Sequence, residues 1–277
     1  MKLETGPEEL YLDLMKKVLT RSGFESDYRA IHMRKGTAGG RIVGPGLKLL
    51  RRTGFDIRRR APADLAARAE GKDLPSEAET MVGLRRLDHL QHCIADVLDN
   101  GVPGDLIETG VWRGGASIFM RAALCAYGDS NRIIWVADSF AGLPKPNEEA
   151  YPNDQNDRHW TAPVLAVSRQ SVEANFERYG LLDDQVRFLE GWFKDTLPAA
   201  PIDSLAIARL DGDMYESTMD ALVALYPKLS VGGHLIVDDY GAIPACRRAV
   251  EDFRVQCDIS EEIEKIDWTG VSWKRLR

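Results

Sequence analysis

Five apolar runs, separated by segments with helical spacing, constrain the fold of this 277-residue chain more than any other feature. Each run is apolar at consecutive positions, as expected of strands that helices cover on both faces. Strands that alternate with helical patterns in this way are typical of a parallel sheet. The runs that we interpret as strands span residues 105–110, 132–140, 186–191, 204–212 and 232–240.

The end of the chain predicts one further pair of strands. Residues 261–277, "EEIEKIDWTGVSWKRLR", place two short alternating segments on either side of Thr269 and Gly270. A turn between two such segments predicts an antiparallel hairpin at the edge of the sheet. We therefore expect an α/β fold with a mostly parallel seven-stranded sheet, helices on both faces and a terminal antiparallel hairpin.

The first 79 residues form a predicted accessory segment that precedes the main domain, residues 80–277. Residues 8–20 space their apolar side chains at helical intervals and predict a helix that packs on the rest of the chain. Residues 29–60 are rich in arginine, lysine and glycine. We predict a solvated loop there, with a short helix at 46–52; a lid or contact surface for an acidic ligand, membrane or partner is the alternative.

Composition and charge argue against several classes of function. A formal net charge of −7 disfavours binding to nucleic acid, which needs an excess of Lys and Arg. No apolar run is long enough for a membrane span, and the amino terminus lacks the apolar core of a signal peptide. The cysteines lack C-x-x-C spacing and predict reduced thiols in a cytoplasmic protein: Cys93, Cys125, Cys246 and Cys257.

Glycines follow the first of the five strands. Gly110, Gly114 and Gly115 allow a tight turn and a close approach of the backbone to a ligand. Their spacing is not that of the dinucleotide-binding motif G-x-G-x-x-G. Asp138 ends the second strand, where an acid can bind the hydroxyls of a ribose. The turn and the acid together predict an adenosine-containing ligand.

Two more positions at these strand ends each allow two interpretations. Glu108 precedes the turn and can pair with a cationic group such as an α-amino group, or it is an ordinary loop or cap carboxylate. Gly191 and Trp192 follow the third strand and can form a wall against an adenine ring. A core or surface position for the tryptophan is the alternative.

Four aspartates follow the fourth and fifth strands. Asp211 and Asp213 lie in "LDGDMYEST", and Asp238 and Asp239 lie in "HLIVDDY". Because ligands of open α/β sheets bind at the carboxyl ends of the strands, these acids and the glycine turn belong to the same edge. Mg²⁺ prefers carboxylate oxygens. We interpret three of the aspartates as metal ligands and the fourth as a base.

Two chemistries fit these acids: phosphoryl transfer of the haloacid-dehalogenase type, and metal-assisted methyl transfer from S-adenosylmethionine to a hydroxyl. In the first class the D-x-D pair follows the first strand, whereas here three strands and a glycine turn precede it. The order of the motifs therefore favours methyl transfer. A non-catalytic scaffold that binds the cofactor is a third interpretation, and the four intact acids argue against it.

Long stretches of the sequence resemble the macrocin O-methyltransferase family, whose relatives include mycinamicin and novobiocin sugar O-methyltransferases. The resemblance covers residues 80–277 and the first helix, and is carried by "GLRRLDHLQHCIADVLDNGVPGDLIETGVWRGGASIFMRA", "ADSFAGLPKP" and "LDGDMYESTMDAL". It implies a class I S-adenosylmethionine-dependent methyltransferase fold, Mg²⁺, and methylation of a deoxysugar hydroxyl on a glycosylated natural product in antibiotic biosynthesis. A phenolic or catechol acceptor fits the same residues.

The resemblance also implies roles for single residues. Asp211, Asp238 and Asp239 match the metal ligands, and Asp213 matches the general base. Residues 144–168 match a mobile substrate lid, and residues 29–72 fit the family pattern poorly, which leaves the acceptor open. Since relatives self-associate, we expect a homo-oligomer. The predicted cofactor contacts are Glu108, Thr109, Gly110, Ser117, Asp138, Ser139, Gly191, Trp192 and Asp211, and the predicted acceptor contacts are His159, Trp160 and Tyr240.

Overall fold

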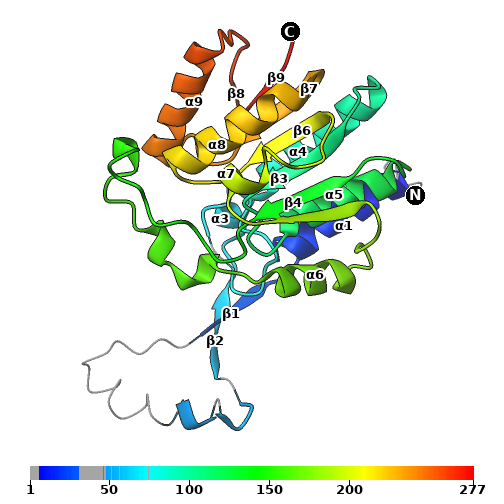
Figure 1. The fold of residues 1–277 in the computed structure, drawn as a ribbon. Helices are drawn as coiled ribbons and strands as arrows, with labels where there is room; N and C mark the ends of the chain where they lie inside the picture. The colour runs from blue at the N-terminus through cyan, green and yellow to red at the C-terminus, as the bar shows by residue number, and fades with distance from the viewer. Residues whose placement is uncertain (1–5, 31–45, 47, 51, 56, 74) are drawn as a thin grey trace.

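Seven strands form one sheet in the order β5-β4-β3-β6-β7-β9-β8 (Figure 1). The structure is a computed structural model that describes residues 6–30, 46, 48–50, 52–55, 57–73 and 75–277. The five strands predicted from apolar runs all pair in parallel, which confirms that prediction. They are β3 (Asp105–Thr109), β4 (Ile134–Asp138), β5 (Val186–Glu190), β6 (Leu205–Leu210) and β7 (Leu229–Val237).

The predicted terminal hairpin closes one edge of this sheet. Its strands are β8 (Glu264–Lys265) and β9 (Val271–Lys274), and β9 pairs antiparallel with both β7 and β8. The Asp267 carboxylate accepts the backbone N–H groups of Thr269 and Gly270 at 2.9 and 2.7 Å, which fixes the turn. The fold class expected from the sequence is therefore confirmed.

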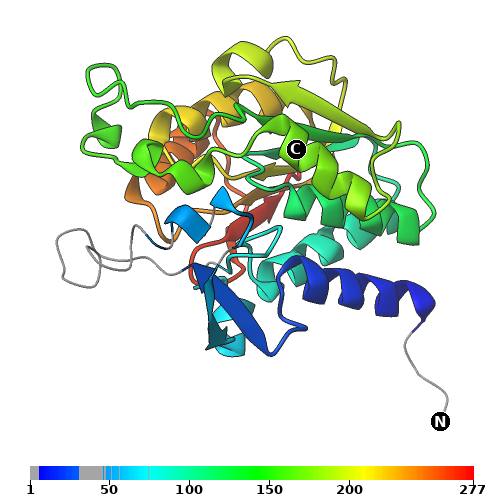
Figure 2. The ribbon, with the colours of Figure 1, turned by 90° about the horizontal axis from the view of Figure 1, so that it is seen from below.

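Helices cover both faces of the sheet, because successive residues of a strand point to opposite faces. Leu106 of β3 packs in one apolar cluster and Ile107 in the other. The amino-terminal helix, predicted from its apolar spacing, packs outside α4 and α5 (Figure 2). One face carries α1 (Pro7–Leu19), α4 (Leu84–Asp99), α5 (Gly115–Ala126) and α6 (Arg169–Arg178); the other carries α7 (Phe193–Thr196), α8 (Tyr215–Leu225) and α9 (Pro244–Gln256).

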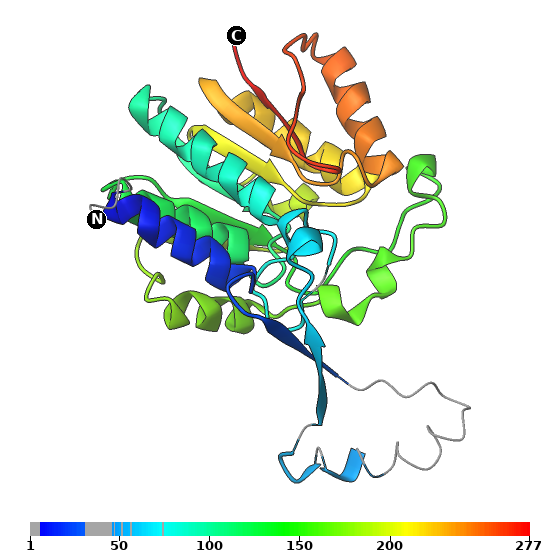
Figure 3. The same cartoon turned by 180° about the vertical axis from the view of Figure 1, so that it is seen from behind.

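A two-stranded ribbon extends from the body of the protein (Figures 1 and 3). It pairs β1 (Ser26–Ala30) with β2 (Arg58–Pro62) and leads into the short helix α3 (Leu65–Ala69). The ribbon was not predicted from the sequence, which indicates a loop rather than strands at residues 29, 30 and 58–60. Of the helix predicted at 46–52, residues 46, 48–50 and 52 are helical; residues 47 and 51, like residues 31–45, lie outside the described residues. Within the described ranges, no helix is long and apolar enough to cross a membrane.

The strand order reverses between β3 and β6, which makes the carboxyl ends of these two strands the expected place for a ligand. Gly110 follows β3 with a left-handed φ of 83°. A Cβ atom at this position would lie 1.7 Å from the carbonyl oxygen of Asp211, the residue that follows β6. Only glycine therefore fits, and the two strand ends touch.

Candidate active site

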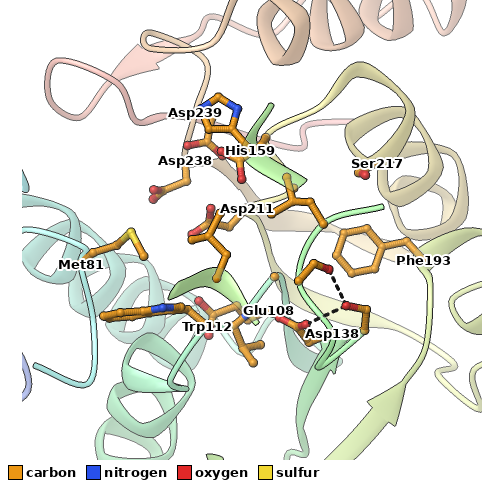
Figure 4. A pocket seen from close by; sticks show the side chains of 18 of the residues that line it. Met81, Glu108, Trp112, Asp138, His159, Phe193, Asp211, Ser217, Asp238 and Asp239 are labelled. Atoms are coloured by element: carbon orange, nitrogen blue, oxygen red, sulfur yellow. Dashed lines mark hydrogen bonds between the residues drawn. The ribbon is translucent and has the colours of Figure 1, made fainter. Parts of the chain in front are cut away.

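A cavity of about 610 Å³ opens at this edge of the sheet (Figure 4). Its lining comes from the strand ends, from the start of α8 and from residues 71–73 of the accessory segment. Met81 and Arg86 line it as well. The predicted site residues that line it are Glu108, Gly110, Asp138, Ser139, His159, Gly191, Trp192, Asp211, Asp213, Asp238 and Asp239.

Four of the predicted residues lie elsewhere. Thr109 and Ser117 are fully buried beside the cavity but do not line it. Trp160 is 40% exposed and lines a separate shallow hollow with residues 145–149. The hydroxyl of Tyr240 donates to Glu251 at 3.3 Å on α9, and its ring lies against Arg247. The structure thus brings His159 to the cavity, but neither Trp160 nor Tyr240.

Three carboxylates meet at the ends of β6 and β7. One oxygen each from Asp211, Asp238 and Asp239 lies within 4.8 Å of the other two. The second oxygen of Asp239, Oδ2, is buried and finds no hydrogen-bond partner among the described residues. Burial, reinforced by the charges of Asp213 and Asp211, raises the pKa of Asp239 well above its usual range. Such a cluster of repelling carboxylates is suited to a divalent cation.

Two buried arginines donate hydrogen bonds to this acidic cluster. Arg209 of β6 donates to Glu108 at 2.7 Å and to Asp211 at 2.9 Å, and its other nitrogen bonds Asp238. Arg86 of α4 bonds the second oxygen of Asp238 and pairs with Asp267 at 2.9 Å. Sequence reasoning missed both cations. A single charge inside the apolar strand "LAIARL" was an available signal for Arg209, whereas none pointed to Arg86.

Asp213 lines the same cavity but is not one of the three clustered carboxylates. Its backbone is left-handed, with φ of 59°, a conformation that aspartate tolerates better than most residues. Burial first, and then the charge of Asp211, raise the pKa of Asp213 to about 7, while His159 opposes the shift. A carboxylate with that pKa is well matched to general-base chemistry near neutral pH.

Asp138 and Glu108, both predicted to contact a cofactor, accept hydrogen bonds from other residues of the protein. The Asp138 carboxylate accepts the N–H groups of Val111 and Phe140, each at 2.7 Å, and so braces the glycine turn. Glu108 accepts from Ser117 and Arg209 rather than standing free. Burial raises the pKa of Glu108 to about 7, although Arg209 opposes the shift.

A mostly parallel seven-stranded sheet of this order, closed by an antiparallel hairpin, is the fold of the class I methyltransferases. The solved structure of the O-methyltransferase NovP superposes with a TM-score of 0.83 at 47% identity, over 98% of this chain and 100% of that one. The Macrocin-O-methyltransferase (TylF) family profile matches residues 8–275, so the family match runs through residues 29–72, where the sequence was expected to fit the family pattern poorly. The chain belongs to this family and is an S-adenosylmethionine-dependent O-methyltransferase, which confirms the resemblance seen in the sequence.

Two curated relatives are similar over most of their length. One, from Streptomyces olivaceus, is 8-demethyl-8-(2,3-dimethoxy-alpha-L-rhamnosyl)-tetracenomycin-C 4'-O-methyltransferase, 54% identical over 96% of this chain and 92% of that protein. The other is demethyldecarbamoylnovobiocin O-methyltransferase from Streptomyces niveus, 55% identical over 76% of this chain and 80% of that protein. Membership of this family does not favour the phosphotransferase alternative.

Proposed function

We propose that this protein methylates a sugar hydroxyl of a glycosylated natural product in antibiotic biosynthesis, with Mg²⁺ at its acidic cluster. The observation that carries the proposal is the meeting of Asp211, Asp238 and Asp239 beside Asp213, in the cavity that also holds the glycine turn. The relatives named for a rhamnosyl tetracenomycin and for a novobiocin precursor support the acceptor class.

The cofactor half of the cavity is assigned to the ends of β3, β4 and β5. Gly110 and Gly191 allow a ligand to approach the backbone, and Asp138 and Ser139 offer polar groups at the end of β4. Trp192 is 36% exposed and lines the cavity, in agreement with a wall against adenine. S-adenosylmethionine bound there would supply the methyl group.

The residues of the acidic cluster fit a divalent cation. The buried Oδ2 of Asp239, which has no hydrogen-bond partner among the described residues, is available to a cation, and each Asp238 oxygen keeps a second lone pair beside its arginine. Mg²⁺ held there would supply the Lewis acidity that lowers the pKa of a sugar hydroxyl, which in water is near the roughly 15.7 of water itself.

The chain's own residues complete the acceptor half. Asp213 accepts the proton of the acceptor hydroxyl, since its raised pKa leaves it basic enough to hold that proton near neutral pH. His159 and the accessory residues at 71–73 form the walls against which the acceptor lies. Enclosure by these walls positions the hydroxyl, and positioning contributes much of the rate in such reactions.

The test combines binding with turnover. Calorimetric titration with S-adenosylhomocysteine, with Mg²⁺ and then with chelator, should give the same affinity, because the metal serves the acceptor. Methyl transfer from radiolabelled S-adenosylmethionine should then be measured with demethyldecarbamoylnovobiocin, with the rhamnosyl tetracenomycin acceptor and with catechol. We expect chelator-sensitive turnover of a glycosylated compound; turnover of catechol alone, or full activity in chelator, would contradict the proposal.

The cytoplasmic location and the homo-oligomer are proposed as well. Cys93 and Cys246 are buried as free thiols, and Cys125 and Cys257 are exposed as free thiols, which supports a reducing compartment. Sedimentation velocity of the purified protein tests the oligomer, and a single species of 30.9 kDa would contradict it.

A further inference from the structure

The first turn of α8 is capped by a residue from a distant part of the chain. The N-terminal N–H groups of a helix need acceptors, yet Met214, in the capping position, makes no side-chain bond. Asp154 supplies them instead: one carboxylate oxygen accepts the N–H of Tyr215 at 2.6 Å, and the other that of Glu216 at 3.0 Å. Asp154 is 1% exposed and lies 61 residues before Tyr215.

Other contacts join the same two parts of the chain. Asp154 ends a single helical turn, η1 (Pro152–Asp154), which contacts both α8 and α9. The ring of Tyr151 packs against that of Tyr215 at 6.1 Å. The Tyr215 hydroxyl in turn donates to Asp252 of α9 at 3.1 Å. Residues 144–168, hereafter the covering segment, are therefore anchored where α8 begins, two residues after Asp213.

A second anchor lies farther along the covering segment. The indole N–H of Trp112, in the glycine turn, donates to the carbonyl oxygen of Val164 at 2.8 Å. Between the two anchors lies His159, which Figure 4 shows directed into the cavity. Its imidazole bonds the Asp157 carboxylate at 2.8 Å. His159 therefore lies in the part of the covering segment between the contacts made at Asp154 and at Val164.

We propose that Asp154 is a positioning residue: by capping α8 it fixes the covering segment, and with it His159, over the acceptor end of the cavity. A carboxylate suits this place because the N-terminus of a helix attracts negative charge. Asp154 does not line the cavity, so it acts through the segment and not on the ligand. The part of the proposal that concerns the acceptor rests on the function proposed above.

Hydrogen–deuterium exchange of the full chain tests the anchor without any acceptor. In Asp154→Ala we expect the amides of Tyr215, Glu216 and residues 150–158 to exchange about five- to tenfold faster, the effect of losing a helix cap. Asp64→Ala is the matched control: it removes the cap of α3, an aspartate whose carboxylate accepts the N–H of Ala67, and should leave residues 150–158 unchanged. Unchanged exchange of residues 150–158 in Asp154→Ala would overturn the anchor.

Steady-state kinetics test the consequence for the acceptor. With the glycosylated acceptor that the wild type methylates, Asp154→Ala should lower kcat/KM for the acceptor by about 10- to 100-fold, the cost of a misplaced wall. The KM for S-adenosylmethionine should stay within about twofold. Asp154→Asn, which keeps one accepting oxygen, should recover part of the loss. Equal losses for both substrates would overturn the positioning role.

The two experiments separate failure of the proposed function from failure of this inference. If the wild type methylates none of the glycosylated acceptors, the proposed acceptor class is wrong, while the exchange data still decide whether Asp154 anchors the covering segment. If the wild type methylates a glycosylated acceptor and Asp154→Ala has the same kcat/KM for that acceptor, the inference is wrong and the proposed function stands.

Discussion

The guanidinium of Arg209 lies 2.7 Å from the carboxylate of Glu108, and both side chains are almost completely buried. The two residues are register partners on the adjacent parallel strands β6 and β3. Arg209 also pairs with Asp211 and Asp238, so one cation joins the Glu108 carboxylate in β3 to the acidic cluster. The pair therefore bears on both stability and activity.

Replacing Arg209 by Met should destabilise the protein by about 3 to 5 kcal/mol, the usual cost of leaving buried charges without their partner. Urea unfolding followed by circular dichroism measures this loss. Arg169→Met is the control, because its partner Glu173 is partly exposed and such surface pairs contribute about 0 to 1 kcal/mol. A loss below about 1 kcal/mol for Arg209→Met would show that the network does not support the fold.

Asp213→Asn should reduce turnover by about 10² to 10⁴, the range for loss of a general base. The fold should survive, because asparagine also tolerates the left-handed backbone of this position. Calorimetry should give an unchanged affinity for S-adenosylhomocysteine. Asp195→Asn, an exposed acid outside the cavity, provides the control, and a variant at position 213 with near-normal turnover would rule out the base assignment.

Asp239→Asn should weaken metal binding at least tenfold, since even loss of a residue that only orients a ligand costs about 10- to 100-fold. The metal-free variant should unfold at the same temperature as the wild type or higher, because the change removes a carboxyl whose ionisation is opposed first by burial and then by the charges of Asp213 and Asp211. Binding of Mn²⁺, followed by electron paramagnetic resonance, separates the two effects. Equal affinities for Mn²⁺ would remove Asp239 from the metal site.

His89 should make stability fall as the pH drops below neutrality. Burial lowers the pKa of His89 to about 4, from about 6.5 in the unfolded chain. Between these values the unfolded chain binds a proton that the folded protein does not, so acid favours unfolding. From pH 7 to pH 5 we expect the wild type to lose about 1 to 2 kcal/mol more than His89→Gln in urea unfolding.

The control for that experiment is His92→Gln, since His92 is exposed on the same helix. It should lose as much stability as the wild type over the same range of pH. If His89→Gln loses as much stability between pH 7 and pH 5 as the wild type, His89 takes up its proton in the folded protein over this range, and the low pKa assigned to it is wrong.

The sheet and the strand-end acids could be predicted because each depends on local sequence. Runs buried on both faces identify β3 to β7, and in a parallel sheet the residues that follow them meet at one edge without any knowledge of packing. Asp211 and Asp239 are found together for this reason.

Contacts between distant parts of the chain could not be predicted in this way. Asp154 caps a helix that begins 61 residues later, and nothing in "YPNDQ" distinguishes it from an ordinary turn aspartate. Arg86 belongs to a helix whose apolar spacing was recognised, but its salt bridge to Asp238 spans 152 residues. Such pairs are set by how the layers pack and not by any periodicity.

The contact of Gly110 with the carbonyl of Asp211 bears on how this enzyme could be altered for new acceptors. Because there is no room for a single methyl group between them, a side chain added at Gly110 would push the ends of β3 and β6 apart. Met81 and Trp268 line the same cavity from outside the parallel strands. Libraries that vary those two side chains would alter the lining of the cavity and leave this contact between the strand ends intact.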